Sequence, residues 1–204
     1  MERILEASPN SLTRSGALSI FPGAQSQGWR LPDQGKFSLS SYGLPLARAD
    51  DLMGILGGFQ ESAQPESGPD GLRVYTLGSY GSAKLGAVES SGGVLALPGG
   101  SEMHLGRHSL CPSGISPTLV GSSIDRFVEC AWRWHWIVPL LAEEQRRAGE
   151  AEIQAWRDGK GADMGEPYAG YQELCRYVLE RFEAIDPSIH AHAGFWSDVI
   201  IDVW

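Results

Sequence analysis

Three short apolar runs, separated by two tight connections, constrain the fold of this chain more than any other feature. They are residues 72–78, 83–90 and 93–99, and they are rich in valine, leucine and tyrosine. The connections SYGS and SGG supply the residues that hairpin turns need for positive φ angles. Strands joined by so few residues must pair antiparallel, because a parallel crossover needs a dozen residues or more. We expect an antiparallel sheet, with residues 102–108 as a fourth strand or an edge.

Proline, glycine and serine interrupt the chain on both sides of this region. Gly43-Leu44-Pro45 breaks whatever precedes it, because the residue before a proline is held in extended geometry. A short helix is expected over residues 49–59, although three glycines weaken it. Residues 63–71 are expected to form a loop, and residues 109–119 a crossing segment.

The first of two long helices is expected to open at Ser122, a suitable N-cap residue with Asp125 three positions later. It extends to Ala148, with a bend near Pro139, which has no backbone N–H to donate. These features predict a helix over residues 122–148.

The second long helix begins near Pro167, which the first helical turn tolerates, and Asp186-Pro187 closes it. Its apolar positions follow the three-to-four spacing of a buried helix face: Tyr171, Leu174, Cys175, Val178, Phe182 and Ile185. Its charged positions fall together on the other side: Glu173, Arg176, Glu180 and Glu183. The tail after this helix is expected to form a short strand or helix whose aromatic side chains pack inward.

Three tryptophans in five positions exceed what one stripe of the first helix can bury. At about 100° per residue, Trp134 lies on the main apolar stripe, whereas Trp132 and Trp136 share another face with Asp125 and Glu129. Two explanations stay open. The amino-terminal segment or the tail covers the pair, as the usual burial of large aromatics favours. Alternatively, the pair is a partner-binding face with an acidic rim.

The negative charge is concentrated near the end of the chain. Of a net charge of −9 over 204 residues, residues 161–204 contribute −6, from eight carboxylates and two arginines. Such a field repels nucleic acid and attracts cationic partners, unless it serves solubility alone. No apolar run has the length of a signal peptide or a membrane span, and the three cysteines are scattered. We therefore expect a cytoplasmic protein without membrane or nucleic-acid partners.

Signatures of catalysis are missing from the sequence, which has no Walker loop, no GxSxG elbow, no GxGxxG and no zinc-deaminase motif. His104 and His108 are four apart but lie in a segment unsuited to a helix, and a third metal ligand is lacking. His190 and His192 are expected in a solvated loop. Cys130 and Cys175 fall on the apolar helix faces and are expected in the core. We expect no catalytic residue, cofactor or metal.

The run YTLGSYGSAKLGAVESSGGVLALPG, followed by LVGSSIDRFVECAWRW, resembles the SUKH superfamily of immunity proteins, particularly its fourth family. In that family a Leu-Gly strand start, a hairpin and a Gly-Val turn precede a helix opening of the form V-N-S-S-x-x-x-F. The matching residues are Leu77-Gly78, Gly93-Val94, Val120-Gly121-Ser122-Ser123 and Phe127, with Gly43-Leu44-Pro45, Asp186-Pro187 and Trp196 as further matches. Gly121 stands where the family has asparagine. The resemblance covers about residues 30–200 and leaves residues 141–165 unexplained.

The resemblance implies an α+β fold with a mostly antiparallel central sheet flanked by helices. Residues 1–30 are then an irregular amino-terminal segment, and residues 31–204 a single immunity domain. It also implies a cytoplasmic antidote that binds a cognate polymorphic toxin, often a nuclease or nucleic-acid deaminase, and occludes its active site without chemistry of its own. The toxin's identity and the oligomeric state stay open.

The residues expected to bind the partner come from the two long helices: Glu129, Trp132, Trp136, Glu173, Glu180 and Glu183. Two rival functions remain. One is a regulatory or scaffold module that uses the same fold to bind a host protein. The other is a small enzyme whose site is assembled from scattered residues, such as His104, His108 and a carboxylate.

Overall fold

The computed structural model describes residues 1–13, 19–20, 24–46, 64–68, 71–80, 83–97, 117–160, 165–190 and 194–202. The expected helix over residues 49–59 and the expected strand over residues 102–108 lie outside the described residues, as do His104, His108, Cys111 and His192.

An antiparallel five-stranded sheet forms the β layer, in the order β3-β4-β5-β6-β7. The three expected central strands are β4 (Arg73–Tyr80), β5 (Ala83–Val88) and β6 (Val94–Leu97), paired as predicted. The edge strands are β3 (Glu66–Ser67) and β7 (Thr118–Gly121). Both edge strands lie in or next to segments that were expected to be connections. Strand β3 lies within the expected loop over residues 63–71, and β7 begins at the end of the expected crossing over residues 109–119.

The turn between β5 and β6 has the positive φ angles that its composition predicted. Gly92 has φ +71°, and Ser90 adopts φ 73° although it is not glycine. The amide of Val88 donates to the carbonyl of Gly93 at 2.8 Å, and the amide of Gly92 donates back to the carbonyl of Val88 at 2.9 Å. Five successive residues of β4, 74–78, are buried, so both faces of this central strand are covered.

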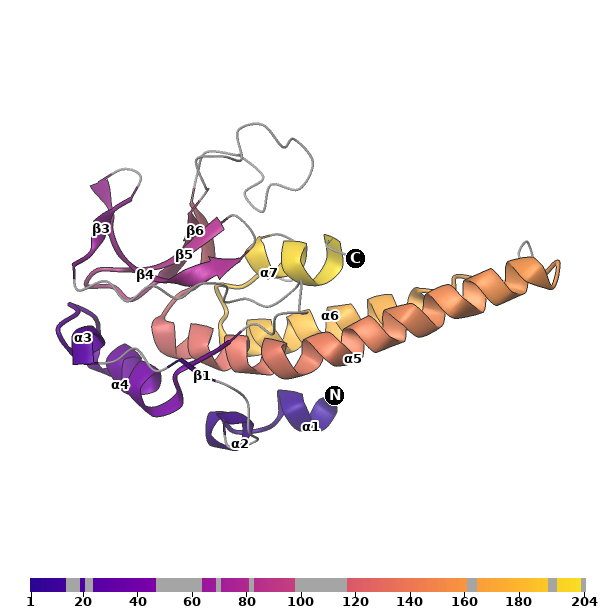
Figure 1. The fold of residues 1–204 in the computed structure, drawn as a ribbon, viewed down its shortest axis with the longest axis horizontal. Coiled ribbons are helices and arrows are strands. Elements are labelled where there is room, and N and C mark those ends of the chain that lie inside the picture. Colours follow the sequence, from indigo (N-terminus) through magenta and orange to yellow (C-terminus); the bar gives the residue numbers. More distant parts are fainter. Residues whose placement is uncertain are drawn as a thin grey trace.

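The helical layer is dominated by α5 (Ile124–Arg157) and α6 (Ala169–Ile185). Helix α5 runs along most of the molecule's longest axis, its second half extends beyond the sheet, and α6 returns alongside it (Figure 1). The expected cap at Ser122 is wrong. The N-cap is Ser123, which makes no side-chain capping bond, and the helix ends nine residues beyond the expected Ala148. Asp186 caps the C-terminus of α6 as expected.

Six short elements precede the sheet in the described residues: α1 (Glu2–Leu5), α2 (Pro9–Thr13), β1 (Ser19–Ile20), α3 (Ala24–Gln27), α4 (Asp33–Tyr42) and β2 (Leu44–Pro45), with β1 antiparallel to β2. Of these, α1, α2, α4 and β2 contact α5, and α1 and α2 lie beneath it in Figure 1. Leu5, Leu12 and Trp29 are buried in the main core. The segment expected to be irregular therefore contains short helices that contribute core residues. Gly43, with φ 61°, ends α4, which confirms the predicted break.

The tail folds as a short helix, α7 (Phe195–Ser197), followed by a π-helix, η3 (Asp198–Asp202). Phe195 and Trp196 are buried, as expected for these two aromatic side chains of the tail. The fold is thus α+β, with a mostly antiparallel sheet and flanking helices, as expected. None of the described helices combines the length and the apolar composition that a membrane span requires.

Candidate functional site

The tryptophans of the second α5 face are covered by the protein itself. Trp132 is 0% exposed, and its indole N–H donates to the carbonyl oxygen of Gly43 at 3.1 Å. Trp136 is partly buried and donates to the carbonyl of Leu12 at 3.1 Å. Because Trp132 exposes no surface, its expected role in partner binding is wrong. Two segments therefore cover this face of α5: residues 1–13, through Leu12, and the end of α4, through Gly43.

Arg133, between the two tryptophans, holds residues 1–13 against α5. Its Nε donates to the carbonyl of Leu5 at 3.1 Å and its Nη2 to the carbonyl of Ala7 at 2.9 Å. The guanidinium also pairs with Glu129, one turn earlier, at 2.8 Å. Glu129 therefore balances a buried cation, and its carboxylate already has a partner within the protein. Residues 1–13 are called the amino-terminal strap below.

The three candidate carboxylates of α6 have a different environment. Glu173 and Glu180 are exposed and Glu183 is partly exposed. At about 100° per residue the three positions fall within about 80° around the helix axis. In the described part of the chain none of them forms an ion pair or a side-chain hydrogen bond. We call these three residues the acidic face of α6.

A buried carboxylate joins the end of α6 to the start of α5. Asp186 is 0% exposed. Its Oδ2 accepts a hydrogen bond from the amide of Ser122 at 2.6 Å, and its Oδ1 accepts one from the Ser122 hydroxyl at 2.9 Å. Ser188 adds its amide at 3.1 Å and its hydroxyl at 2.8 Å, and Arg126 pairs with Oδ1 at 3.3 Å. Ser122 thus binds a residue 64 positions away instead of capping α5.

These contacts set the protonation of Asp186. Burial by itself raises the pKa of the carboxyl, but the hydrogen bonds from Ser122 and Ser188 outweigh it, so the net pKa lies below its ordinary value. The carboxylate is therefore charged at neutral pH and holds the α5–α6 junction in place.

A second long-range bond lies next to this cluster. The indole N–H of Trp196 donates to the carbonyl of Val120 at 2.8 Å, which ties α7 to the edge strand β7. Val120, Ser122, Asp186 and Trp196 are among the residues that carry the family resemblance. In the structure these residues bond to one another, so they hold the fold rather than present a surface.

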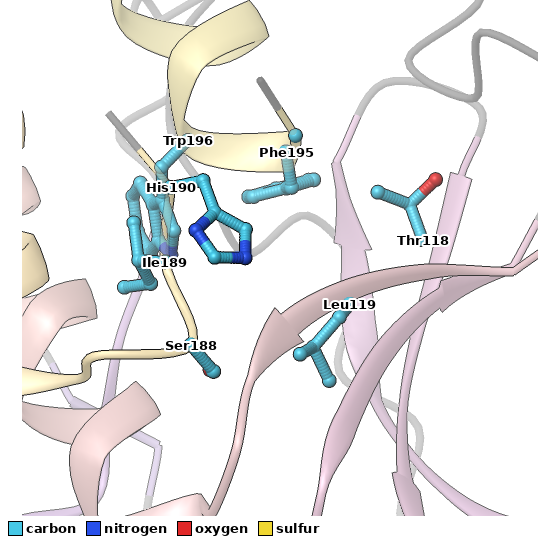
Figure 2. Close-up of a pocket in the computed structure, with 8 residues that line it drawn as sticks. Thr118, Leu119, Ser188, Ile189, His190, Phe195 and Trp196 are labelled. Carbon is cyan, nitrogen blue, oxygen red and sulfur yellow. The ribbon is translucent and has the colours of Figure 1, made fainter. Parts of the chain in front are cut away.

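A cavity of about 290 Å³ opens beside Trp196. Thr118 and Leu119 of β7 line one side, and Ile189, His190 and Trp196 lie across from them (Figure 2). His190 is exposed, as its assignment to a solvated loop requires. The cavity lies at the edge of the sheet, and its walls combine apolar side chains with Thr118, Ser188 and one imidazole.

Cys130 and Cys175 are buried, which confirms their assignment to the core. Burial also raises the pKa of the Cys130 thiol well above its ordinary value, so it is not a nucleophile at neutral pH. Among the described residues, no group of three or more histidine, cysteine, aspartate or glutamate side chains is arranged to hold a metal ion.

The fold defines a class of protein: an α+β domain with an antiparallel sheet and a long helical hairpin. The model of the SUKH-4 immunity protein family matches residues 10–202, nearly the whole chain, and the chain belongs to this family. No curated protein and no solved structure matches it. Membership implies a role in toxin immunity and indicates a binding protein rather than an enzyme.

The family match begins at residue 10, about twenty residues before the segment in which we noticed the resemblance. Part of the amino-terminal strap is therefore matched by the family model. The contacts of Trp136 with Leu12, and of Trp132 with Gly43, fall within the matched span.

Proposed function

We propose that this protein neutralises a cognate polymorphic toxin in the cytoplasm by binding it and occluding its active site. The observation that supports this most is the acidic face of α6. It presents three carboxylates without ion-pair partners in the described part of the chain, in a protein of net charge −9.

The environment of other carboxylates makes this face distinctive. On the second half of α5, Glu143 pairs with Arg146 at 2.8 Å and with Arg147 at 3.0 Å, and Glu150 also pairs with Arg146. Those charges cancel locally, so their field does not reach far from the surface. The acidic face of α6 has Arg176 as its one neighbouring cation on the exposed side of that helix, and its field extends into solvent.

The partner that suits such a face is basic. Toxins that act on nucleic acid need cationic clefts to hold phosphates. We therefore propose a nuclease or a nucleic-acid deaminase as the toxin, with the acidic face of α6 directed at its substrate cleft. The same field repels nucleic acid itself, which is why we assign no nucleic-acid partner.

The proposed contact surface differs from the expected one. Glu173, Glu180 and Glu183 are retained. Glu129 and Trp136 contribute at most at its margin, because Arg133 and the amino-terminal strap occupy them. A stable interface of ordinary size buries about 800 Å² on each partner, so residues beyond α6 must also take part.

The test is an inhibition titration against the product of the neighbouring toxin gene, after co-purification of the two proteins. Tight binding predicts that toxin activity falls linearly with added protein and reaches zero at a fixed molar ratio. An enzyme that inactivates the toxin would act at far lower ratios and with time. Full toxin activity in the presence of excess folded protein would contradict the proposal.

One variant distinguishes neutralisation by binding from the rival function, an enzyme whose active site includes His104 and His108. Replacing both His104 and His108 with alanine is expected to leave the titration unchanged, because the proposal gives these two side chains no part. Loss of inhibition with the fold intact would favour the enzyme alternative.

A further inference from the structure

The end of α5 carries an apolar surface that is open to solvent. Trp156 is the most exposed large apolar side chain among the described residues, at 65%, and Ile153, one turn before it, is 53% exposed. Cover from the α6 side ends earlier, at Gly149, where an added Cβ would lie 3.2 Å from the hydroxyl oxygen of Tyr168, the N-cap of α6. An exposed tryptophan beside a second apolar side chain is typical of an interaction surface.

Two cations flank this surface. Arg157 follows Trp156 directly and Lys160 lies one turn after it; both are exposed, and neither forms an ion pair with a described residue. Asp158 lies between them in the sequence, but it accepts a hydrogen bond from the amide of Gln154 at 2.9 Å. The surface therefore combines an apolar centre with available positive charge. The tip of α5 is the name used below for four residues: Ile153, Trp156, Arg157 and Lys160.

A second cavity, of about 560 Å³, lies where α5, α6 and η3 meet and opens to solvent. Tyr168, Tyr171 and Ile201 give it apolar surface, and Ile201 is 42% exposed. Aromatic rings pack favourably against tyrosine, either offset or edge-on. The cavity therefore suits an aromatic side chain. The remaining wall residues are Gln145, Gln172, Cys175 and Arg176.

The acidic face of α6 borders this cavity. Glu173 lies three residues before Arg176 of the wall, and Glu180 lies four residues after it. Neither carboxylate forms an ion pair within the described part of the chain, and Glu183 adds a third, so the face stays negative despite Arg176. The tip of α5 has an exposed indole and positive charge, and this region has an open apolar cavity and negative charge. A second copy of the chain supplies the complement of each.

The tip and the cavity lie on the same side of the α5–α6 hairpin. At about 100° per residue, Trp156 falls within about 20° of Gln145, a wall residue, around the α5 axis. Gly149 and Tyr168 mark one level along the hairpin. At about 1.5 Å per residue, Trp156 lies about 10 Å beyond that level, and Cys175 of the wall lies about 10 Å from it in the opposite direction. A two-fold axis that crosses the hairpins at this level, between two copies, thus brings each Trp156 to the other copy's cavity.

The same rotation matches the charges. Arg157 and Lys160 lie about 12 and 16 Å beyond the axis, and Glu173 and Glu180 lie about 8 and 18 Å from it in the other direction. Rotation therefore brings the two cations of each copy to the level of the carboxylates of the other.

We propose that this protein forms a symmetric dimer with a second copy of itself, in which Trp156 of each copy enters the other's cavity and the tip cations pair with Glu173 and Glu180. The contact is the same in both directions, so the assembly closes at two copies. It buries on the order of 500 Å² per copy, less than the about 800 Å² of an ordinary interface, so we expect a weak dimer with a dissociation constant of about 10–100 µM. The proposal does not rest on toxin neutralisation; under the proposed function, the dimer and the toxin compete for the acidic face of α6.

Sedimentation equilibrium of the full chain, over about 1–300 µM, tests the dimer without any partner. The average mass is expected to rise with concentration from one chain to two. Raising the salt from about 0.02 to 0.15 M should weaken the dimer several-fold, because the charges that meet are at the surface. The mass of one chain at every concentration overturns the proposal, and so does a mass that continues to rise beyond two chains.

A matched pair of variants tests the tryptophan. Trp156→Ala is expected to weaken the dimer at least about tenfold. Phe37→Ala shortens a ring on α4 that is similarly exposed, at 55%, and should leave the dimer unchanged. Equal losses in the two variants would show general apolar association and overturn the assignment. A monomeric wild type whose Trp156→Ala variant binds the toxin less tightly would assign the tip to the toxin and overturn the dimer.

A charge exchange tests the pairing of the two surfaces. One variant carries Arg157→Glu and Lys160→Glu, and the other carries Glu173→Lys and Glu180→Lys. Each alone is expected to be monomeric at 100 times the concentration at which the wild type is half dimeric, because like charges meet at both contacts, or about a hundredfold loss. An equimolar mixture should dimerise about as tightly as the wild type, because both contacts then join opposite charges. If the mixture stayed monomeric while both variants were folded, the proposed arrangement would be wrong.

Discussion

The first half of α5 and the outer face of α6 both carry side chains outside the main apolar stripe of their helix, and the two sets lie in opposite environments: Trp132 and Trp136 are packed within the protein, whereas the α6 carboxylates face solvent. On α5 the surplus is indole and guanidinium, which donate to backbone carbonyls of Gly43, Leu12, Leu5 and Ala7. On α6 the surplus is three carboxylates, which acquire no described partner.

The difference follows from the groups available to cover each face. Backbone carbonyls, here of Leu12 in the strap and of Gly43 at the end of α4, can satisfy an indole N–H while its ring is packed against the protein. Carboxylates need cations or amide donors, and a strap that buried three of them without such partners would be strongly unfavourable. Excess tryptophan on a helix is thus consistent with an internal role, whereas excess unpaired carboxylate remains available to a partner.

The largest effect is expected from Trp132→Ala. The change removes a fully buried ring and leaves the carbonyl of Gly43 without its donor. We expect the free energy of unfolding to fall by about 3–5 kcal/mol, measured by chemical denaturation. A loss below about 1 kcal/mol would contradict the burial of this face and would return Trp132 to the partner surface.

Arg133→Gln is expected to act mainly on the amino-terminal strap. The variant loses charge-assisted bonds to Leu5 and Ala7 and leaves Glu129 without its partner, at a cost of about 2–3 kcal/mol. Hydrogen exchange should quicken in residues 1–13 more than in the central sheet. Uniform quickening across the chain would show that the strap does not open as a separate unit.

Asp186→Asn is expected to cost about 2 kcal/mol at neutral pH, because charge-assisted bonds from Ser122, Ser188 and Arg126 weaken. The folded pKa of Asp186 is lowered, so the carboxylate stabilises the wild type above the ordinary pKa of about 3.9. That contribution disappears as pH falls through the folded pKa. Acid titration of unfolding should therefore bring variant and wild type closer together below about pH 4. A gap independent of pH would count against this role.

The smallest effect on stability is expected from substitutions in the acidic face of α6. Replacing Glu173, Glu180 and Glu183 together with glutamine should change the free energy of unfolding by less than about 0.5 kcal/mol, because the side chains are exposed or partly exposed and form no ion pair in the described part of the chain. Thermal unfolding of the triple variant beside the wild type measures this. A large loss would show that the face has a structural role.

The sequence predicted those parts of the fold that depend on neighbouring residues, namely the central strands and the buried face of α6. The three central strands follow from short runs and tight turns, and the buried face of α6 follows from its periodicity, with Tyr171, Cys175, Val178 and Phe182 all buried. The exposure of Glu173 and Glu180 follows from the same periodicity, because one buried stripe fixes the opposite face.

Features that depend on distant partners were missed. Strand β7 has four residues and is a strand because it pairs with β6. Helix α4 buries Gly35, where an added Cβ would lie 3.2 Å from Cβ of Ile124, so its packing depends on a small residue rather than an apolar stripe. The bond between Ser122 and Asp186 spans 64 positions, and the N-cap pattern at Ser122 gave no sign of it.

The association rate of this protein with its toxin tests the central claim most directly. The matched pair is the triple glutamine variant at Glu173, Glu180 and Glu183, and a control triple variant with the same change in net charge, at Glu2, Glu152 and Glu166. We predict that the α6 variant associates about tenfold more slowly than the wild type at low ionic strength, that the control loses much less, and that raising salt to about 0.15 M removes most of the difference. The account would be contradicted if the two variants and the wild type associated with the toxin at equal rates and if these rates did not change with salt.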